Sequence, residues 1–499
     1  MKIEIKERFK IMQNYKGRNL TMLTDLYELT MAQSYFNRGR HEKVIFDVFY
    51  RRNPFGNGFA IACGIDDVVE YIRDLHFEKE DVEYLRSLGI FSDGFLSYLC
   101  HFKFTGNLYA VENGTVVFPM EPIVKVEADI CEAQIVETAI LNLVNHQTLI
   151  ATKAERVKWA AKGDSVLEFG LRRAQGPDAG LYGAKAAVIG GCNSTSNVLA
   201  GQMFNVALSG THAHSYVMSF DSEIEAFRAY VETFPKAAIL LVDTYDTLRH
   251  GVPDAIQVFK EMKAAGALPK KGEGIYGIRL DSGDLAWLSI KAREMLDEAG
   301  FEDAVISASS DLDENLIESL KGQGAKIGVW GVGTNLITAK DNPALGGVYK
   351  LAAVEENGQY VPKIKLSENI EKITNPGNKT ILRIVDKNTG LIRADLIVLA
   401  DEVYDDENDL EVFDPIETWK KKVIKGGSYD IVNLHKQYFR DGVQVAKERD
   451  TLGAKKHCEE SLATLSVESR RLLNPHKVHV DLSKKLWDLK NELIAKERA

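Results

Sequence analysis

The chain has 499 residues, of which 45% are hydrophobic and 27% are charged, and its formal net charge is −10. This length predicts two or three domains, and the composition is ordinary for a globular protein. The negative charge argues against non-specific nucleic-acid binding, which needs a basic face.

The sequence carries no sign of export or membrane insertion. It opens with the charged stretch MKIEIKERFK and contains no run of 18 apolar residues, so neither a signal peptide nor a membrane span is expected. Its five scattered cysteines lack the spacing of a zinc site and are typical of free thiols in a reducing compartment. We therefore expect a cytoplasmic protein.

Two stretches near the N-terminus carry candidate ligand-binding side chains. The first, LTDLYELTMAQSYF (residues 23–36), has helical spacing and places Tyr27 off its main apolar face. Tyr27 is either a half-buried surface residue or a platform for a flat ligand. The second, residues 44–64, has two β-type runs that flank Arg51 and Arg52. This pattern predicts a hairpin whose tip either reaches a phosphate or is a solvated turn.

The middle of the chain predicts an irregular (β/α) barrel. About seven β-type runs alternate with helical segments, each unit having roughly 30 residues, close to the ~250 residues typical of such a barrel. The first three runs are SVLEFGLR, AAVIGGC and NVALSGT, and the later ones end near Asp243, Asp281, Ser309 and Thr334. Because active sites of parallel α/β folds lie at the carboxyl ends of the strands, we expect the function there.

The last part of the chain predicts short antiparallel strands followed by a charge-rich helical tail. Turn signals such as NPGN and KNTG separate the strands. The whole chain is therefore predicted to be an α/β protein with three domains. These are a mixed α+β domain (1–135), the barrel-like domain (136–354) and an antiparallel and helical region (355–499).

Charged side chains gather at the ends of the predicted barrel strands. The acids Asp243, Asp281 and Asp284 suit sugar hydroxyls, Mg²⁺ or a developing positive charge, although Asp281 or Asp284 could instead cap the helix that follows. Arg172 and Arg279 carry the planar guanidinium that matches phosphate and carboxylate oxygens. Together they describe a site for a phosphorylated, hydroxylated and anionic small molecule.

Two loops add polar groups to this predicted site. The GVGTN turn, with Gly333 and Thr334, could direct backbone N–H groups at an anion, or could be an ordinary turn. Ser282 adds a hydroxyl directly after Asp281. The GTHAHS loop carries His212 and His214, and a histidine there can act as acid, base or phosphoryl acceptor.

Several of these motifs, in this order, resemble the nicotinate phosphoribosyltransferase family. They are TDLYELTMAQSYF, EFGLRRAQGPDAG, STSNVLAG, GTHAHS, LVDTYDTL, IRLDSGDL and GVGTN. The resemblance implies an irregular α/β barrel beside a mixed N-terminal domain. It also implies transfer of a phosphoribosyl group from 5-phosphoribosyl 1-pyrophosphate to nicotinate, giving nicotinate mononucleotide and pyrophosphate. Mg²⁺ and ATP hydrolysis would accompany the reaction.

The resemblance also implies roles for individual residues. The last histidine of GTHAHS, His214, matches the residue that is phosphorylated. Tyr27, Thr211 and Arg279 match nicotinate contacts, and Thr334 matches a contact of the phosphoribosyl donor. A homodimer with shared active sites is implied, with Tyr27 supplied by the neighbouring subunit. For Arg172, Asp243 and Asp281 the expected role rests on their strand-end positions alone.

Two other functions are compatible with the same pattern. One is a phosphoribosyltransferase specific for nicotinamide or quinolinate. The other is a non-catalytic barrel that senses nucleotides. The joint presence of His214, Arg279 and the GVGTN turn favours an enzyme, because a binding protein needs no phosphoryl acceptor.

Overall fold

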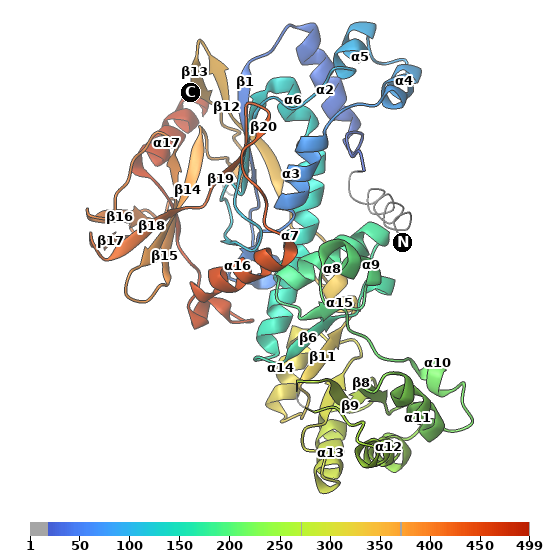
Figure 1. Cartoon of the computed structure of the whole chain (residues 1–499). Coiled ribbons are helices and arrows are strands. Elements are labelled where there is room, and N and C mark those ends of the chain that lie inside the picture. Colours follow the sequence, from blue (N-terminus) through green and yellow to red (C-terminus); the bar gives the residue numbers. More distant parts are fainter. Residues whose placement is uncertain (1–17, 271, 370–371, 499) are drawn as a thin grey trace. The chain divides into compact units, whose positions relative to one another are not determined.

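The computed structural model describes residues 18–270, 272–369 and 372–498, so the opening MKIEIKERFK stretch lies outside the described residues. The chain divides into two compact units (Figure 1). The first contains the described residues up to Thr152 and those from Ala344 onward, and the second is Lys153–Pro343. The predicted segments 1–135 and 355–499 thus contribute to one unit.

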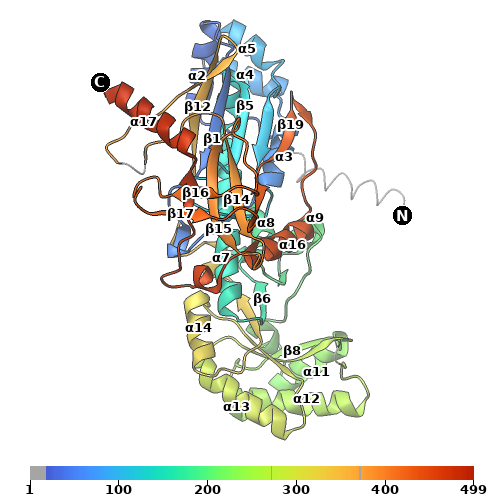
Figure 2. The ribbon, with the colours of Figure 1, turned by 90° about the vertical axis from the view of Figure 1, so that its left-hand side faces the viewer.

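A seven-stranded sheet is the centre of the first unit. Its strands, in spatial order, are β13 (Gln359–Pro362), β12 (Val348–Glu356), β1 (Lys43–Phe49), β5 (Val124–Asp129), β3 (Asn107–Ala110), β19 (Lys436–Arg440) and β20 (Val443–Gln444). Every neighbouring pair is antiparallel. β1 lies between β12 and β5, as Figure 2 shows, and six of its seven residues are buried. Burial on both faces explains why its sequence is a nearly continuous apolar run.

The predicted hairpin at residues 44–64 is wrong. β1 pairs with β12 and β5, whereas the following strand β2 (Ala60–Ile61) pairs with β4 (Val116–Val117). The short 3₁₀ helix η1 (Pro54–Gly56) lies in the connection between β1 and β2. Arg51 and Arg52 therefore lie in a crossing connection between two sheets, not at a hairpin tip.

Helices cover the sheet of the first unit, and α2 confirms the helix predicted from LTDLYELTMAQSYF. Fully buried aromatic side chains, among them Tyr50, Phe59 and Tyr349, fill the core of this unit. Its helices are α2 (Leu26–Asn37), α3 (Ile65–Asp74), α4 (Lys79–Ser87), α5 (Asp93–Leu99), α6 (Ile130–Ile135), the first part of α7 (Glu137–Ala160), α16 (Thr451–Ala463), η5 (Val467–Arg470) and α17 (Lys484–Arg498).

The same unit contains a smaller, four-stranded sheet, in line with the predicted antiparallel and helical C-terminal region. Two buried ion pairs stabilise it: Arg383 with Asp395 across two adjacent strands, and Lys379 with Asp47 of β1 at 2.7 Å. Only the pair β15–β21 is parallel among the described strands here. The strands are β14 (Lys379–Asp386), β15 (Ile392–Leu399), β18 (Tyr429–Asn433) and β21 (Val480–Leu482), beside a separate pair, β16 (Leu410–Phe413) and β17 (Lys421–Ile424).

The second unit is built on an all-parallel sheet. Its six strands, in spatial order, are β7 (Ser194–Thr195), β6 (Ser165–Glu168), β11 (Val329–Val332), β10 (Val305–Ala308), β9 (Ile275–Leu280) and β8 (Ala237–Leu241). The sheet is curled but open within the described residues, so it forms a half-barrel, and the predicted α/β class with an irregular barrel is confirmed in this form. Gly277 permits the approach of β9 to β10, because an added Cβ would lie 2.0 Å from the Val305 carbonyl oxygen.

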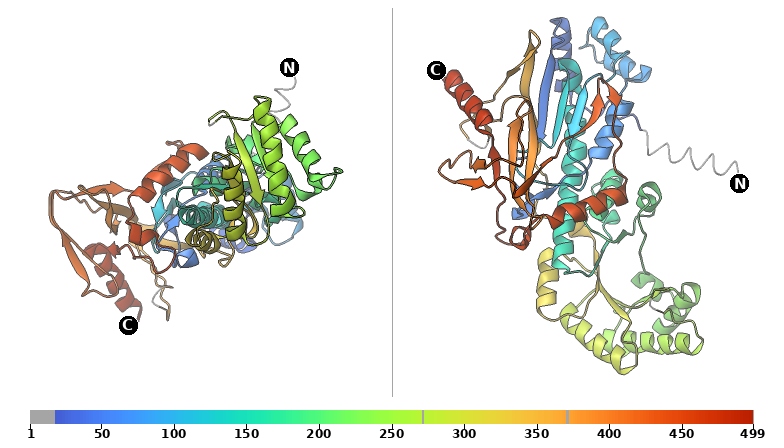
Figure 3. Two further views of the ribbon diagram at one scale, coloured as in Figure 1. Left: turned by 90° about the horizontal axis from the view of Figure 1, so that it is seen from below. Right: turned by 60° about the vertical axis from the view of Figure 1, so that its left-hand side comes forward.

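Helices connect these strands, and α12 and α13 run along one side of the sheet (Figure 3). Two expected strands are absent as such. AAVIGGC is mostly the last turns of a helix, α8, and NVALSGT contributes only the isolated bridge of Leu208 with Thr195. The helices are α8 (Pro177–Ile189), α9 (Val198–Phe204), α10 (His214–Val217), α11 (Glu223–Thr233), α12 (Val252–Ala264), α13 (Leu285–Glu298), α14 (Glu314–Gly322) and α15 (Thr334–Ile337), with short turns η2 (Leu171–Arg173) and η3 (Thr247–Gly251).

None of the helices in the described part of the chain has the length and apolar character needed to cross a membrane.

Candidate active site

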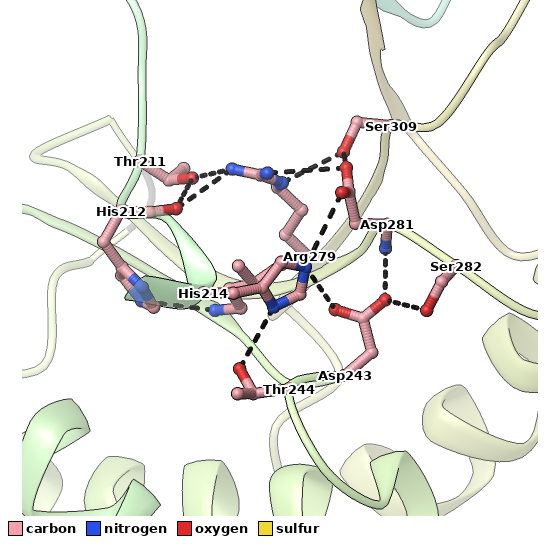
Figure 4. Close-up of polar contacts among 10 residues, drawn as sticks. Thr211, His212, His214, Asp243, Thr244, Arg279, Asp281, Ser282 and Ser309 are labelled. Atoms are coloured by element: carbon pink, nitrogen blue, oxygen red, sulfur yellow. Dashed lines mark hydrogen bonds and ion pairs between the residues drawn. The ribbon is translucent and has the colours of Figure 1, made fainter. Parts of the chain in front are cut away.

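A cluster of polar side chains lies at the carboxyl ends of β8, β9 and β10, together with the loop that precedes α10 (Figure 4). The parallel register explains this: Leu241 of β8 pairs with Arg279 of β9, and Leu280 of β9 pairs with Ala308 of β10. Residues directly after each strand therefore meet at one edge. The structure brings together the sequence-predicted residues Thr211, His214, Asp243, Arg279, Asp281 and Ser282.

Arg279 is the centre of this cluster, and its side chain is only 15% exposed. Nε donates to the Ser309 hydroxyl at 3.0 Å. One terminal nitrogen donates to the Thr211 hydroxyl and, at 3.2 Å, to the His212 carbonyl, and the other lies 3.4 Å from Oδ1 of Asp281. These contacts fix the orientation of the guanidinium group. They leave one of its five N–H donors without a partner among the described residues.

Asp243 lies at the base of the cluster and is almost completely buried. Its Oδ2 accepts the backbone N–H of Asp281 at 2.8 Å and the Ser282 hydroxyl at 2.7 Å. Its Oδ1 has no hydrogen-bond partner among the described residues. A buried carboxylate oxygen without a donor is costly, so this atom is available to a bound cation or hydroxyl group.

His214 begins α10 and places both ring nitrogens near polar groups. Nδ1 lies 3.2 Å from the Thr244 hydroxyl. Nε2 faces two carboxylates, 3.7 Å from Asp281 and 4.0 Å from Asp243. The side chain is 39% exposed, so a ligand could reach the ring from solvent.

His212 occupies a different environment from His214. It is buried against the rings of Tyr216 and Tyr230, and its Nε2 accepts the backbone N–H of Leu241 at 3.2 Å. Burial lowers the pKa of His212 to about 4. The neutral imidazole accepts a hydrogen bond from β8 and so has a structural role. His212 was accordingly not among the predicted site residues.

Ser309 and Thr244 belong to the cluster, although neither was predicted as a site residue. The Ser309 hydroxyl donates to Asp281 and accepts from Arg279, and Thr244 contacts His214. Each follows directly after a strand or a predicted strand-end acid, so the strand-end rule would have identified both. The two open alternatives for the acids are also resolved: Asp284 caps α13 by accepting from Trp287, whereas Asp281 faces the cluster.

Three predicted residues of the second unit lie outside the Arg279 cluster. Arg172 is exposed in η2, after β6. Gly333 and Thr334 lie where β11 meets α15, and an added Cβ at Gly333 would lie 3.2 Å from the Phe169 carbonyl oxygen. No hydrogen bond joins these three to Arg279 within the described part of the chain, and their role stays a prediction.

Tyr27 belongs to the first unit, where the residue is 45% exposed on α2. Desolvation, followed by the nearby carboxylate of Glu137, raises the pKa of Tyr27. Next to it, Glu28 is fully buried and accepts the backbone N–H and the hydroxyl of Thr138 at 2.8 and 2.6 Å. Glu28 thus fixes the first turn of α2 and with it the position of Tyr27.

A second cationic feature lies in the first unit. Arg51, Arg52 and Lys372 line a cavity of about 780 Å³ together with Glu368 and other residues. Arg51 also packs on the Phe49 ring, with 5.7 Å from its guanidinium carbon to the ring centroid. The predicted choice between a phosphate contact and a solvated turn stays open, although Arg51 is partly buried.

The donor set can be tested against the predicted Mg²⁺. The described residues contain no group of three or more His, Cys, Asp or Glu side chains arranged so that they could hold a metal ion by themselves. Mg²⁺ in phosphate-transfer sites commonly uses one or two carboxylates and takes its other ligands from water and substrate phosphates. Oδ1 of Asp243, which accepts no hydrogen bond from the described residues, and the neighbouring Asp281 fit that mode.

Comparison with known proteins assigns the family. Three models match the chain: the nicotinate phosphoribosyltransferase N-terminal domain (residues 22–145), the family model itself (165–390) and the C-terminal domain (378–490). A nicotinate phosphoribosyltransferase of Bacillus subtilis is 46% identical over 483 residues, which cover 96% of each chain. The chain belongs to the nicotinate phosphoribosyltransferase family.

Two solved structures resemble this chain, one within the nicotinate phosphoribosyltransferase family and one in fold alone. The crystal structure of human nicotinic acid phosphoribosyltransferase matches with a TM-score of 0.80 and 30% identity, covering 94% of this chain and 99% of that one. A nicotinate-nucleotide pyrophosphorylase from Pyrococcus furiosus, 21% identical with a TM-score of 0.68, covers 90% of this chain and 97% of its own, and shares the fold.

Proposed function

We propose that this nicotinate phosphoribosyltransferase family member transfers the phosphoribosyl group of 5-phosphoribosyl 1-pyrophosphate to nicotinate, giving nicotinate mononucleotide and pyrophosphate. The observation that carries the proposal is the convergence of Arg279, Thr211, His214, Asp243 and Asp281 on one edge of the parallel sheet. A cationic group, two carboxylates and a histidine in this arrangement suit an anionic pyridine and a phosphorylated sugar.

The chemistry of the transfer matches the charges in the cluster. The pyridine nitrogen of nicotinate attacks the anomeric carbon as the bond to pyrophosphate breaks, so positive charge develops on the ribose. We assign the stabilisation of this charge to Asp243 and Asp281, because their carboxylates lie together beside His214. The pyridine nitrogen already has a free lone pair, and no general base is needed.

Binding of nicotinate is assigned to Arg279 and Thr211. Contacts with Ser309, Asp281 and the Thr211 hydroxyl fix the orientation of the guanidinium group. A carboxylate would take the free N–H donor and compete for the donor now used by Thr211. When bound, Mg²⁺ would neutralise charge on the departing pyrophosphate, with Asp243 and Asp281 as its protein ligands.

ATP hydrolysis is proposed to pass through a phosphohistidine at His214. A proton on Nε2 is favoured by the carboxylates of Asp281 and Asp243, which leaves Nδ1 with the lone pair. The Nδ1–phosphorus bond forms as the bond from the γ-phosphorus to the bridging oxygen breaks and ADP leaves. Water later hydrolyses the phosphohistidine.

A homodimer with shared active sites is proposed as the assembly. Two observations support this proposal. Tyr27 matches a nicotinate contact of the family, and it lies exposed on α2 in the first unit, whereas the Arg279 cluster belongs to the second. An exposed aromatic ring fixed by a buried neighbour is suited to stack on a pyridine of another subunit. The cytoplasmic location stays a prediction.

The test is pyrophosphate release by the purified full-length protein with 5-phosphoribosyl 1-pyrophosphate, ATP and Mg²⁺. Nicotinate, nicotinamide and quinolinate are supplied in parallel. The proposal expects release with nicotinate and formation of its mononucleotide. Preferential turnover of nicotinamide or quinolinate would favour the alternative specificities, and no turnover with any of the three would favour a nucleotide-sensing protein.

A further inference from the structure

A polar cavity of about 390 Å³, here called the C-terminal pocket, lies in the first unit. Its walls are the turn between β14 and β15, strand β17, and the segments at 464–469 and 476–479. Backbone hydrogen bonds join these walls: Ile392 donates to Thr464 at 2.8 Å, and Asp395 donates to His479 at 2.9 Å. The pocket is therefore a built part of the fold, not a gap between loose loops.

The charges around the C-terminal pocket are unbalanced. Its one acidic side chain, Asp386, is already occupied by Arg393, whose Nε donates at 2.8 Å, and by the Thr389 hydroxyl at 3.0 Å. Lys422 and Lys477 line the same cavity, and neither forms an ion pair with any carboxylate in the described part of the chain. Two unpaired ammonium groups around one cavity, in a protein of net charge −10, favour an anionic ligand.

The remaining lining residues indicate what kind of anion fits. Two histidines, His476 and His479, provide further donors, whereas the Ser466 hydroxyl already contacts the backbone N–H and the hydroxyl of Ser469. Leu465 and Val478 contribute apolar surface to the same cavity. The pocket volume of about 390 Å³ lies near the lower end of the roughly 300–1,000 Å³ that ligand pockets span. This volume is larger than a bare phosphate needs.

We propose that the C-terminal pocket binds a small organic phosphate, with the phosphate group between Lys422 and Lys477 and an organic body against Leu465 and Val478. A nucleoside monophosphate has this chemistry. None of the lining residues belongs to the Arg279 cluster, so this is a second ligand site and does not depend on the proposed catalytic function.

The experiment uses the full-length protein and three probes: AMP, adenosine and inorganic phosphate. Affinity is measured by isothermal titration for the wild type, for Lys422→Glu/Lys477→Glu, and for the milder Lys477→Gln. The matched control is Lys421→Glu, since Lys421 is adjacent on β17 but outside the pocket and lies 3.5 Å from Glu411. Hydrogen–deuterium exchange with AMP then locates the binding site, including any separate binding at the Arg279 cluster.

The expected result is AMP binding that the double variant weakens by roughly tenfold or more and the control leaves unchanged, since each lysine supplies a charged hydrogen bond. AMP should slow exchange at residues 388–393 and 464–479 in the wild type and in the Lys421→Glu control, but not in the double variant. Unchanged AMP affinity in the double variant, or no slowing at these residues, would overturn the proposal. Equal affinity for inorganic phosphate and AMP would overturn the assignment of an organic body.

Discussion

The Nε2 atom of His214 lies 3.7 Å from Oδ2 of Asp281. This carboxylate favours the tautomer with the proton on Nε2, so that Nδ1, which lies beside the Thr244 hydroxyl, would be the nucleophile in the proposed phosphoryl transfer. Asp281 is also in contact with Arg279 and Ser309. One side chain thus links the proposed phosphoryl acceptor to the proposed nicotinate contact.

The first prediction concerns His214. His214→Ala should abolish ATP hydrolysis and leave weak, ATP-independent formation of nicotinate mononucleotide, because only the phosphoryl acceptor is removed. ADP and mononucleotide are measured in the same reactions. His250→Ala, an exposed histidine of the same unit, is the control and should behave like the wild type. Unchanged ATP hydrolysis in His214→Ala would refute the assignment.

The second prediction concerns the preference for nicotinate over nicotinamide. The two ligands share a ring and differ in a carboxylate against a neutral amide, so a charged partner must discriminate between them. A site that matches the polar groups of its ligand can lower kcat/KM for a mismatched analogue by a factor on the order of 10⁴. Arg279→Ala should lose most nicotinate activity and most of this preference in kcat/KM.

The control for Arg279→Ala is Arg228→Ala, because Arg228 is an exposed arginine of the second unit that pairs with Glu261 at 2.7 Å. It should leave both activities unchanged. If Arg279→Ala lowers nicotinate and nicotinamide activity by the same factor, the guanidinium serves the phosphoribosyl donor instead, and the specificity assignment is wrong.

The third prediction concerns subunit sharing. If Tyr27 completes the neighbour's site, Tyr27→Ala and His214→Ala are each inactive or weak in ATP-coupled turnover. Mixed dimers would then contain one site with both residues intact. Co-refolding or subunit exchange of the two variants should restore a fraction of the coupled activity. Confirmed exchange without any recovery would count against a shared site.

The fourth prediction is a pH dependence of stability centred on Glu28. Burial raises the pKa of Glu28 to about 7, although the Thr138 hydrogen bonds act in the opposite direction. The folded state then holds a proton that the unfolded state, with an ordinary carboxyl pKa, has lost. This contribution to the free energy of unfolding is present at low pH and is lost as the pH rises through about 7.

Glu28→Gln should remove that slope, which can reach about 1.4 kcal/mol per pH unit for one proton. The measurement is denaturant unfolding between pH 5 and 8. Glu83→Gln, an exposed glutamate of α4, is the control and should keep the wild-type slope. An identical slope in Glu28→Gln and the wild type would show that another group is responsible.

Much of the candidate site could be predicted because the carboxyl ends of parallel strands meet at one edge. This rule alone identified Asp243 and Asp281, which lie after β8 and β9. It could not state that Asp243 accepts from Ser282 while Asp281 accepts from Ser309, since side-chain pairing depends on strand order. The order β10-β9-β8 has no local sequence signal.

The two incorrect elements have a physical cause. The AAVIGGC run lies in and just after α8, and six of its seven residues are buried, so this short apolar run has no period to separate helix from strand. The 44–64 hairpin was predicted from proximity in sequence, but β1 finds its partners in β5 and β12. Long-range pairing of this kind leaves no trace in a local pattern.

The position of β1 between β5 and β12 has a consequence for synthesis of the chain. β12 begins about 300 residues after β1 ends. At roughly 5–20 residues per second, a nascent chain therefore exposes an open edge of β1 for about 15–60 s. An apolar edge strand left open in this way is an aggregation hazard, so we expect assistance by a chaperone. Proteolysis of ribosome-bound chains should cut near β1 until residues 348–356 have emerged.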